Sequence, residues 1–210
     1  MKRLLWPMAL VFAFLAASPY ATAQEMKMKD HSSKPEQLRI AMHKLWEDHV
    51  TWTRNVILNI IDGLPGTDQA VARLLRNQED IGKAIKPIYG DAAGNELTRL
   101  LKDHITIAAE LLKAARMDDN TAFDAANKKW SGNADEIAAF LSKANPNWKL
   151  AEMKHMMHDH LDLTTREAVA RLKKDYEADI KAYDQVHEEI LLMADMLTEG
   201  IVKQFPERFK

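Results

Sequence analysis

The chain has 210 residues, with 29 lysine and arginine residues against 31 aspartate and glutamate residues, and its formal net charge is −2 at pH 7. Nucleic-acid binding normally needs a strongly basic surface, so this balance disfavours nucleic acid as a partner. The chain has no cysteine, which excludes both a disulfide framework and thiolate chemistry.

Residues 1–23 predict a signal peptide that is cleaved before Gln24. Lys2 and Arg3 precede the apolar run LLWPMALVFAFLAA, and the small residues at 21–23 match a cleavage site. A transmembrane helix needs about 20 apolar residues, and neither this run nor any later segment reaches that length. We therefore expect an exported protein, periplasmic or secreted, without a transmembrane anchor.

The mature chain is expected to form one helical domain. Residues 24–34 are polar and aperiodic, which predicts a flexible lead-in, residues 35–205 have helical periodicity, and residues 206–210 form a tail. Apolar positions that alternate in spacings of four and three predict the first helices at about 35–62, 67–87, 93–116 and 120–143. Pro87 and Gly90 are expected to end the second helix, and Gly132 to interrupt the fourth.

The last third of the chain is expected to contain a short helix and then a long one. Asn145 can cap, and Pro146 can begin, a helix of about 15 residues. Thr164 followed by Glu167 fits a capping box, which predicts a break at 162–164 and a new helix after it. Charged residues of both signs between 166 and 184 predict an exposed face of that helix, and they include Lys173, Lys174, Asp175, Glu177 and Asp179.

No segment has the alternation that is typical of a strand. The predicted fold class is therefore all-α. We expect an antiparallel up-down helical bundle of about five or six helices, with a long C-terminal helix.

Polar residues interrupt the inward stripes of several predicted helices at similar heights. Counted from the shared turns, His49, Gln78 and His104 lie level with one another, and Gly132 leaves room on the fourth helix. His187 has the same heptad position on the last helix, although the predicted break leaves its height open. Such a layer could satisfy its own hydrogen bonds. The alternative is that it binds a metal ion or a small ligand, because neutral imidazole is the commonest metal ligand.

The stretch EMKHMMHDH at 152–160 concentrates imidazole and thioether side chains, and it includes His155, Met156 and His158. These ligand types together suit copper, with thioether favouring the reduced ion. The lead-in repeats this chemistry with three residues, Met26, Met28 and His31. The alternative interpretation is that the methionines fill the core while the histidines are solvated.

Other classes of site find less support in the sequence. A ferritin-like carboxylate site needs Glu-x-x-His motifs on two helices, and only Glu152 to His155 fits well. Covalent haem is excluded by the missing Cys-x-x-Cys-His, and noncovalent haem is disfavoured. There is no glycine-rich phosphate loop and no nucleophile elbow, so a role other than catalysis is favoured, although an enzyme stays open.

Four stretches resemble a family of exported bacterial helical-bundle proteins for which no catalytic residue is established. They are LWEDHVTWTRNVI, LLRNQEDIGKAIKPIYGDAAGNELTRLLKDHI, NADEIAAFL and MMHDHLDLTTREAV, and they extend over most of the mature chain. The resemblance implies an exported helical fold. Members are sometimes named glycosyltransferases, but nucleotide-sugar enzymes of that kind normally need an α/β domain, and this sequence has no strand signal.

We therefore expect an exported bundle that binds a metal ion, with copper favoured. His49, His104 and His187 would be inward ligands, Gln78 would assist them, and His155, Met156 and His158 would form an accessory site. The alternative is a non-catalytic periplasmic interaction or stress-related bundle whose polar layer only fixes helix register. The sequence does not specify a protein partner, and it is compatible with a homo-oligomer.

Overall fold

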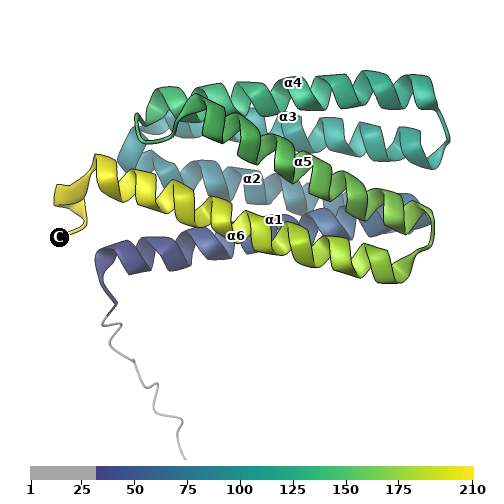
Figure 1. Cartoon of the computed structure of the whole chain (residues 1–210), viewed down its shortest axis with the longest axis horizontal. Coiled ribbons are helices and arrows are strands. Elements are labelled where there is room, and N and C mark those ends of the chain that lie inside the picture. The colour runs from purple at the N-terminus through teal and green to yellow at the C-terminus, as the bar shows by residue number, and fades with distance from the viewer. Residues whose placement is uncertain (1–31) are drawn as a thin grey trace, which may run out of the picture. The chain divides into compact units, whose positions relative to one another are not determined.

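The computed structural model describes residues 32–210, and all of its regular secondary structure there is helical. The helices are α1 (Lys34–Asp62), α2 (Thr67–Tyr89), α3 (Asp91–Arg116), α4 (Asn120–Ala144), α5 (Leu150–Leu172) and α6 (Tyr176–Gln204), followed by the short 3₁₀-helix η1 (Pro206–Arg208). Figure 1 shows the six long helices lying side by side. The predicted all-α antiparallel bundle is confirmed for this part of the chain.

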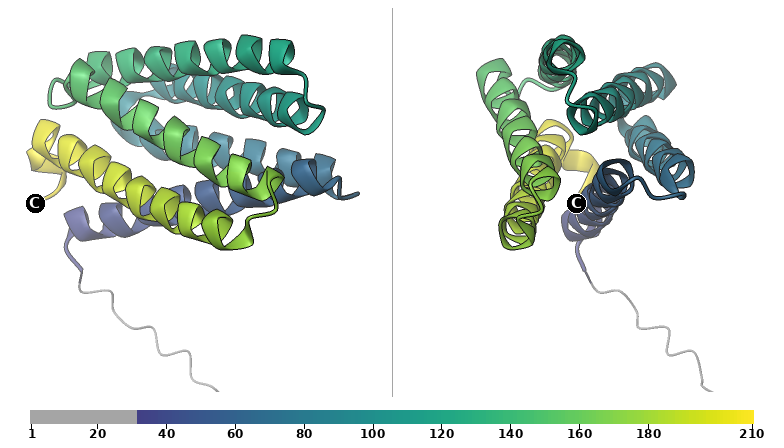
Figure 2. Two further views of the ribbon diagram at one scale, coloured as in Figure 1. Left: turned by 45° about the vertical axis from the view of Figure 1, so that its right-hand side comes forward. Right: turned by 90° about the vertical axis from the view of Figure 1, so that its right-hand side faces the viewer.

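The helices are arranged in chain order around the bundle. Each helix packs against the next one along the chain, and α6 packs against α1, as the end-on view in Figure 2 shows. Short connections make successive helices antiparallel neighbours. The described chain is therefore three helical hairpins, α1–α2, α3–α4 and α5–α6, with α1 also in contact with α3 and α5.

Side-chain and backbone caps fix most helix boundaries. Ser33, Asp119 and Asp175 each accept a hydrogen bond from the backbone N–H three residues later, which satisfies a donor that the first helical turn leaves free. Gly63 ends α1 in the left-handed region, with φ of 68°, where a side chain would be strained. Pro87 does not end α2, which continues through it to Tyr89.

The predicted break at 162–164 is wrong, because α5 runs without interruption from Leu150 to Leu172. Thr164 is buried inside this helix, and the Glu167 side chain accepts a hydrogen bond from Arg54 of α1 and does not cap a helix. The chain instead turns at 173–175, where Lys174 has φ of 61° and Asp175 caps α6.

Two further local predictions are also wrong. Asn145 ends α4, and its side-chain oxygen accepts from the backbone N–H of Asn147, so that α5 begins only at Leu150, beyond Pro146. Gly132 is exposed and does not interrupt α4, which is continuous from Asn120 to Ala144.

The core is divided into two apolar clusters. One contains Val50 and Ile190 among its fully buried side chains, and the other contains Val56, Ile57 and Leu74. The change from one cluster to the other falls between Val50 and Val56 on α1, next to the buried polar residue His49. The polar layer therefore lies between two apolar halves of the bundle.

Some predictions concern residues outside the described range of 32–210. These are the signal peptide at 1–23 and the lead-in residues Met26, Met28 and His31. Within the described range, no helix combines the length and the apolar character that a membrane span requires. In the predicted tail, Arg208 donates a hydrogen bond to the backbone oxygen of Pro87 at 2.7 Å.

Candidate functional site

Three buried histidines from three helices meet in the middle of the bundle. His49 of α1, His104 of α3 and His160 of α5 are each at most 4% exposed. The ring centroids of His49 and His160 are 5.8 Å apart. All three histidines line both of two neighbouring cavities, of about 40 Å³ and about 30 Å³. They therefore form one layer with a small cavity on either side.

Each imidazole is held through its Nδ1 atom by a side chain on the second helix of its own hairpin. The three pairs are His49 with Gln78 at 3.2 Å, His104 with Asn133 at 2.7 Å, and His160 with Glu189 at 2.9 Å. In every pair the partner lies 29 residues after the histidine. Each of the three hairpins thus contributes the same pair, a histidine and its hydrogen-bond partner, at the same height in the bundle.

Backbone contacts repeat in the first two hairpins as well. Asn77 donates to the carbonyl oxygen of Leu45, and Asn133 donates to that of Leu100, which in both hairpins is the residue four positions before the histidine. The described chain therefore contains an internal repeat of one helical hairpin, which was not predicted from the sequence. Its sequence signal is the triplet of aspartate, histidine and an aliphatic residue at 48–50, 103–105 and 159–161.

Both ring nitrogens of His104 are occupied. The indole N–H of Trp130 donates to Nε2 at 3.1 Å, so Nε2 carries the lone pair and Nδ1 carries the proton that is donated to Asn133. Burial, reinforced by the nearby His160, lowers the pKa of His104 to about 3. His104 is therefore neutral near pH 7, and its Nε2 is covered by the indole.

His49 and His160 each have one ring nitrogen that is not engaged. Among the described residues, no hydrogen bond uses Nε2 of either ring. Burial lowers the pKa of His49 well below its usual value, and the neighbouring His160 and His104 lower it further. The larger cavity beside these rings is also lined by three methionines, Met42, Met157 and Met193.

The structure brings together part of the predicted core site. His49, Gln78 and His104 lie in one buried layer, as predicted. On α4, the residue that faces the layer is Asn133. The prediction had placed the preceding residue, Gly132, at this position, but Gly132 is exposed. His187 does not join the layer, because its side chain is 36% exposed and its Nε2 lies 3.5 Å from a carboxylate oxygen of Glu47.

His160 fills the place for which His187 was predicted. His160 was not predicted as a core residue, because the expected break at 162–164 separated it from the rest of α5. In the continuous helix, Met153, Met157, His160, Thr164 and Glu167 form one buried stripe with spacings of four and three.

The predicted accessory residues are not gathered at one point. His155 is exposed, with its Nε2 3.3 Å from Asp159 one helical turn later. His158 faces α4, where its Nε2 lies 3.0 Å from a carboxylate oxygen of Asp135. Met156 is buried and lines a groove together with His155.

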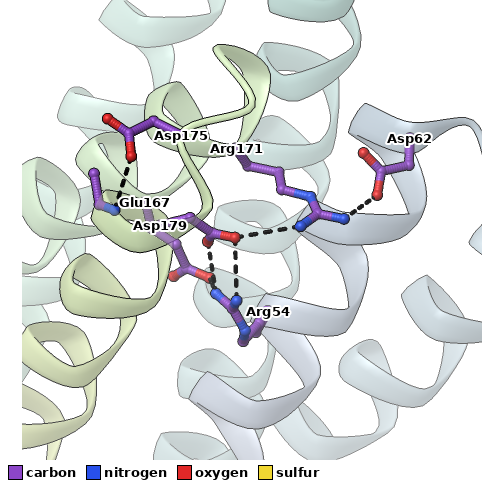
Figure 3. Close-up of polar contacts among 7 residues, drawn as sticks. Arg54, Asp62, Glu167, Arg171, Asp175 and Asp179 are labelled. Atoms are coloured by element: carbon purple, nitrogen blue, oxygen red, sulfur yellow. Dashed lines mark hydrogen bonds and ion pairs between the residues drawn. The ribbon is translucent and has the colours of Figure 1, made fainter.

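A second buried polar cluster lies at the end of the bundle where α5 turns into α6 (Figure 3). Asp179 accepts from both terminal nitrogens of Arg54, at 2.8 and 3.2 Å, and Glu167 accepts from the same guanidinium at 2.7 Å. Arg171 contacts Asp179 at 3.4 Å and also pairs with Asp62. Burial raises the pKa of Glu167 to about 7, against the opposing effect of the hydrogen bond from Arg54.

This cluster corrects the predicted exposed face at 166–184. Lys173, Lys174, Asp175 and Glu177 are exposed as predicted, but Glu167 and Asp179 are each 1% exposed. The buried carboxylates connect α5 and α6 to Arg54 of α1.

Within residues 32–210, no group of three or more His, Cys, Asp or Glu side chains is positioned to hold a metal ion. No family model, curated protein or solved structure matches the chain.

Proposed function

We propose that the protein is exported and that it binds copper(I) in its core, between His49 and His160. The supporting observation is that two imidazoles from different helices lie 5.8 Å apart with no hydrogen bond to either Nε2 atom among the described residues. Bonds between a metal ion and an imidazole nitrogen are about 2.0–2.1 Å long, so one ion can bridge two rings at such a separation.

The choice of copper(I) follows from the ligands that are present. Structural zinc is almost always held by four ligands, and the described residues have no group of even three imidazoles or carboxylates placed for it. Copper(I) is soft and is satisfied by as few as two neutral ligands, imidazole or thioether. Met157 and Met193 line the cavity beside His49 and His160, and either thioether can complete the site.

His104 and Gln78 act in this proposal as positioning residues. The Nε2 atom of His104 accepts a hydrogen bond from Trp130, so His104 is not a ligand in this proposal and only packs beside the two ligating rings. The amide nitrogen of Gln78 donates to Nδ1 of His49, while its Oε1 atom is buried and has no hydrogen-bond partner among residues 32–210. The ion needs the tautomer of His49 that carries its proton on Nδ1 and its lone pair on Nε2. Oε1 of Gln78 can accept that proton once the amide rotates, which exchanges its hydrogen bonds to the Leu74 carbonyl and to Asn77 for this one.

The charge and size of the site suit a monovalent ion. Glu189 accepts from Nδ1 of His160, and a carboxylate behind a ligating imidazole fixes its tautomer and helps to offset the charge of the ion. The cavity of about 40 Å³ admits an ion or a few water molecules. Pockets for larger organic ligands measure about 300–1,000 Å³, so haem would require the helices to separate.

Anaerobic titration with copper(I) against a competing chelator tests the proposal. We expect the wild-type protein to bind copper(I) in its core, and the double variant His49→Gln/His160→Gln to bind at that site about 100-fold more weakly or not at all. His187→Gln is the matched control, because His187 is partly exposed and lies outside the layer. Unchanged affinity in a folded double variant would reject this site.

A second candidate function is supported by the complete pairing of His104. Its two nitrogens are satisfied by Asn133 and Trp130, which is typical of a polar layer that fixes helix register. In that case the protein is an exported interaction or stress-related bundle without a metal ion. The same titration distinguishes the two, since a register layer predicts no binding by the wild-type core.

A further inference from the structure

A groove on the surface between α5 and α6 carries soft ligands of the same kinds as the core. Its volume is about 340 Å³, and the lining residues that matter here are His155, Met156, Asp159, Glu189, Met193 and Met196. Methionines are common core filler, but Met196 is only partly buried, and His155 beside Met156 is 80% exposed. The imidazole of His155 and the thioether of Met196 are thus accessible together, and the buried Met156 and Met193 line the inner wall of the groove.

Two side chains connect this groove to the histidine layer. Met193 lines both the groove and the larger core cavity. Glu189 lines the groove and also accepts from His160 through its Oε2 atom, while its Oε1 atom is buried and has no hydrogen-bond partner in the described part of the chain. Met193 and Glu189 would therefore lie between an ion in the groove and His160 in the core.

We propose that the groove is a second binding site for copper(I) and that the ion passes from it to the core. This inference rests on the proposed copper(I) site in the core, because the groove would be the route by which the ion reaches that site. The thioethers of Met156 and Met196 and the imidazole of His155 hold the ion in the groove, and the carboxylates of Asp159 and Glu189 attract a cation to it.

The transfer is a ligand exchange that involves no oxidation or reduction. The bond from the ion to a groove thioether breaks as the bond to Nε2 of His160 forms, with the thioether of Met193 as the ligand in between. The ion keeps its single positive charge. No proton leaves His160, because its proton lies on Nδ1 in the hydrogen bond to Glu189.

The experiment uses the full chain labelled at the methionine methyl groups, with copper(I) and its redox-inert analogue silver(I) as probes. Met156→Leu/Met196→Leu removes the groove thioethers with little change in volume. Met117→Leu is the matched control, because Met117 is 70% exposed at the end of α3 and away from the groove. His49→Gln/His160→Gln removes the core ligands but leaves the groove intact.

In the core variant, silver(I) should still shift the methyl signals of Met156 and Met196. In the groove variant, copper(I) should load the core about tenfold more slowly or slower still, with final core affinity unchanged, whereas Met117→Leu should load at the wild-type rate. Loading of the groove variant at the wild-type rate would overturn the route and leave the core site standing. Methyl shifts in the groove together with unchanged affinity in the core variant would overturn the core site and the transfer to it, and no binding by the wild-type protein would overturn both.

Discussion

At the scale of single residues, Trp130 determines which nitrogen of His104 carries a proton. Its indole N–H points at Nε2, so the ring must present Nδ1–H to Asn133. The low pKa of about 3 follows chiefly from burial, and the indole donor gives the neutral ring a fixed tautomer. This hydrogen bond distinguishes His104 from His49 and His160, whose Nε2 atoms make no hydrogen bond within residues 32–210.

Replacing Trp130 with phenylalanine should show how much this hydrogen bond contributes to the free energy of unfolding. Trp130→Phe leaves a buried acceptor without a donor, which costs about 1–3 kcal/mol beyond the loss of ring volume. Trp148→Phe is the control, because Trp148 is equally buried but its N–H has no hydrogen-bond partner among the described residues. Urea unfolding should therefore show the larger loss for Trp130→Phe, and equal losses would contradict the assigned role.

At the scale of helices, α2 and α3 approach each other closely at two glycines, Gly82 and Gly94. A methyl group at Gly82 would lie 2.6 Å from the carbonyl oxygen of Gly94 and would collide with Thr98. The close approach places the second helix of the first hairpin directly against the first helix of the next. It therefore helps to set the height of Gln78 relative to His104.

We expect Gly82→Ala to destabilise the protein by about 1–3 kcal/mol, because the added methyl group forces the helices apart. Gly132→Ala is a matched control in another helix interior, since a methyl group there meets nothing within 4 Å. That change should stabilise α4 by about 0.5–1 kcal/mol, because alanine loses less backbone freedom than glycine. Thermal unfolding of both variants checks the difference in sign, and a loss of equal size in both would count against the close contact.

The helices that the sequence could and could not predict differ for a physical reason. The first four were predicted within a few residues, since the spacing of four and three continues along each helix, through its few buried polar residues, and stops at the turns. The pattern from Thr164 to Glu167 imitates a helix start, but Glu167 is taken up by a distant arginine, which no local pattern reveals. That single error concealed His160 and left His187 as the predicted third histidine, whereas His49, Gln78 and His104 were placed correctly.

At the scale of the described domain, three copies of one hairpin are arranged in a ring. The histidine comes from the first helix of each hairpin and its partner from the second, so all three imidazoles reach the centre. The partners differ, being an amide in two hairpins and a carboxylate in the third, which makes His160 unlike the other two. The ring closes where α6 meets α1, and there Arg54 holds Glu167 and Asp179 (Figure 3).

This closing contact should make stability depend on pH through Glu167. Its pKa of about 7, against 4.5 ordinarily, means that between these values the folded protein keeps a proton that the unfolded chain has lost. The free energy of unfolding therefore falls as the pH rises through this window. Glu167→Gln stays uncharged, so its stability relative to wild type should rise by on the order of 3 kcal/mol from pH 4.5 to 8, at about 1.4 kcal/mol per pKa unit.

The lowered pKa values of His49 and His104 act in the opposite sense, with stability lost as the pH falls below 6.5, but they are common to both proteins and cancel in the difference. Urea unfolding across this range, with the exposed Glu177→Gln as control, checks the prediction, and parallel profiles for wild type and Glu167→Gln would contradict it.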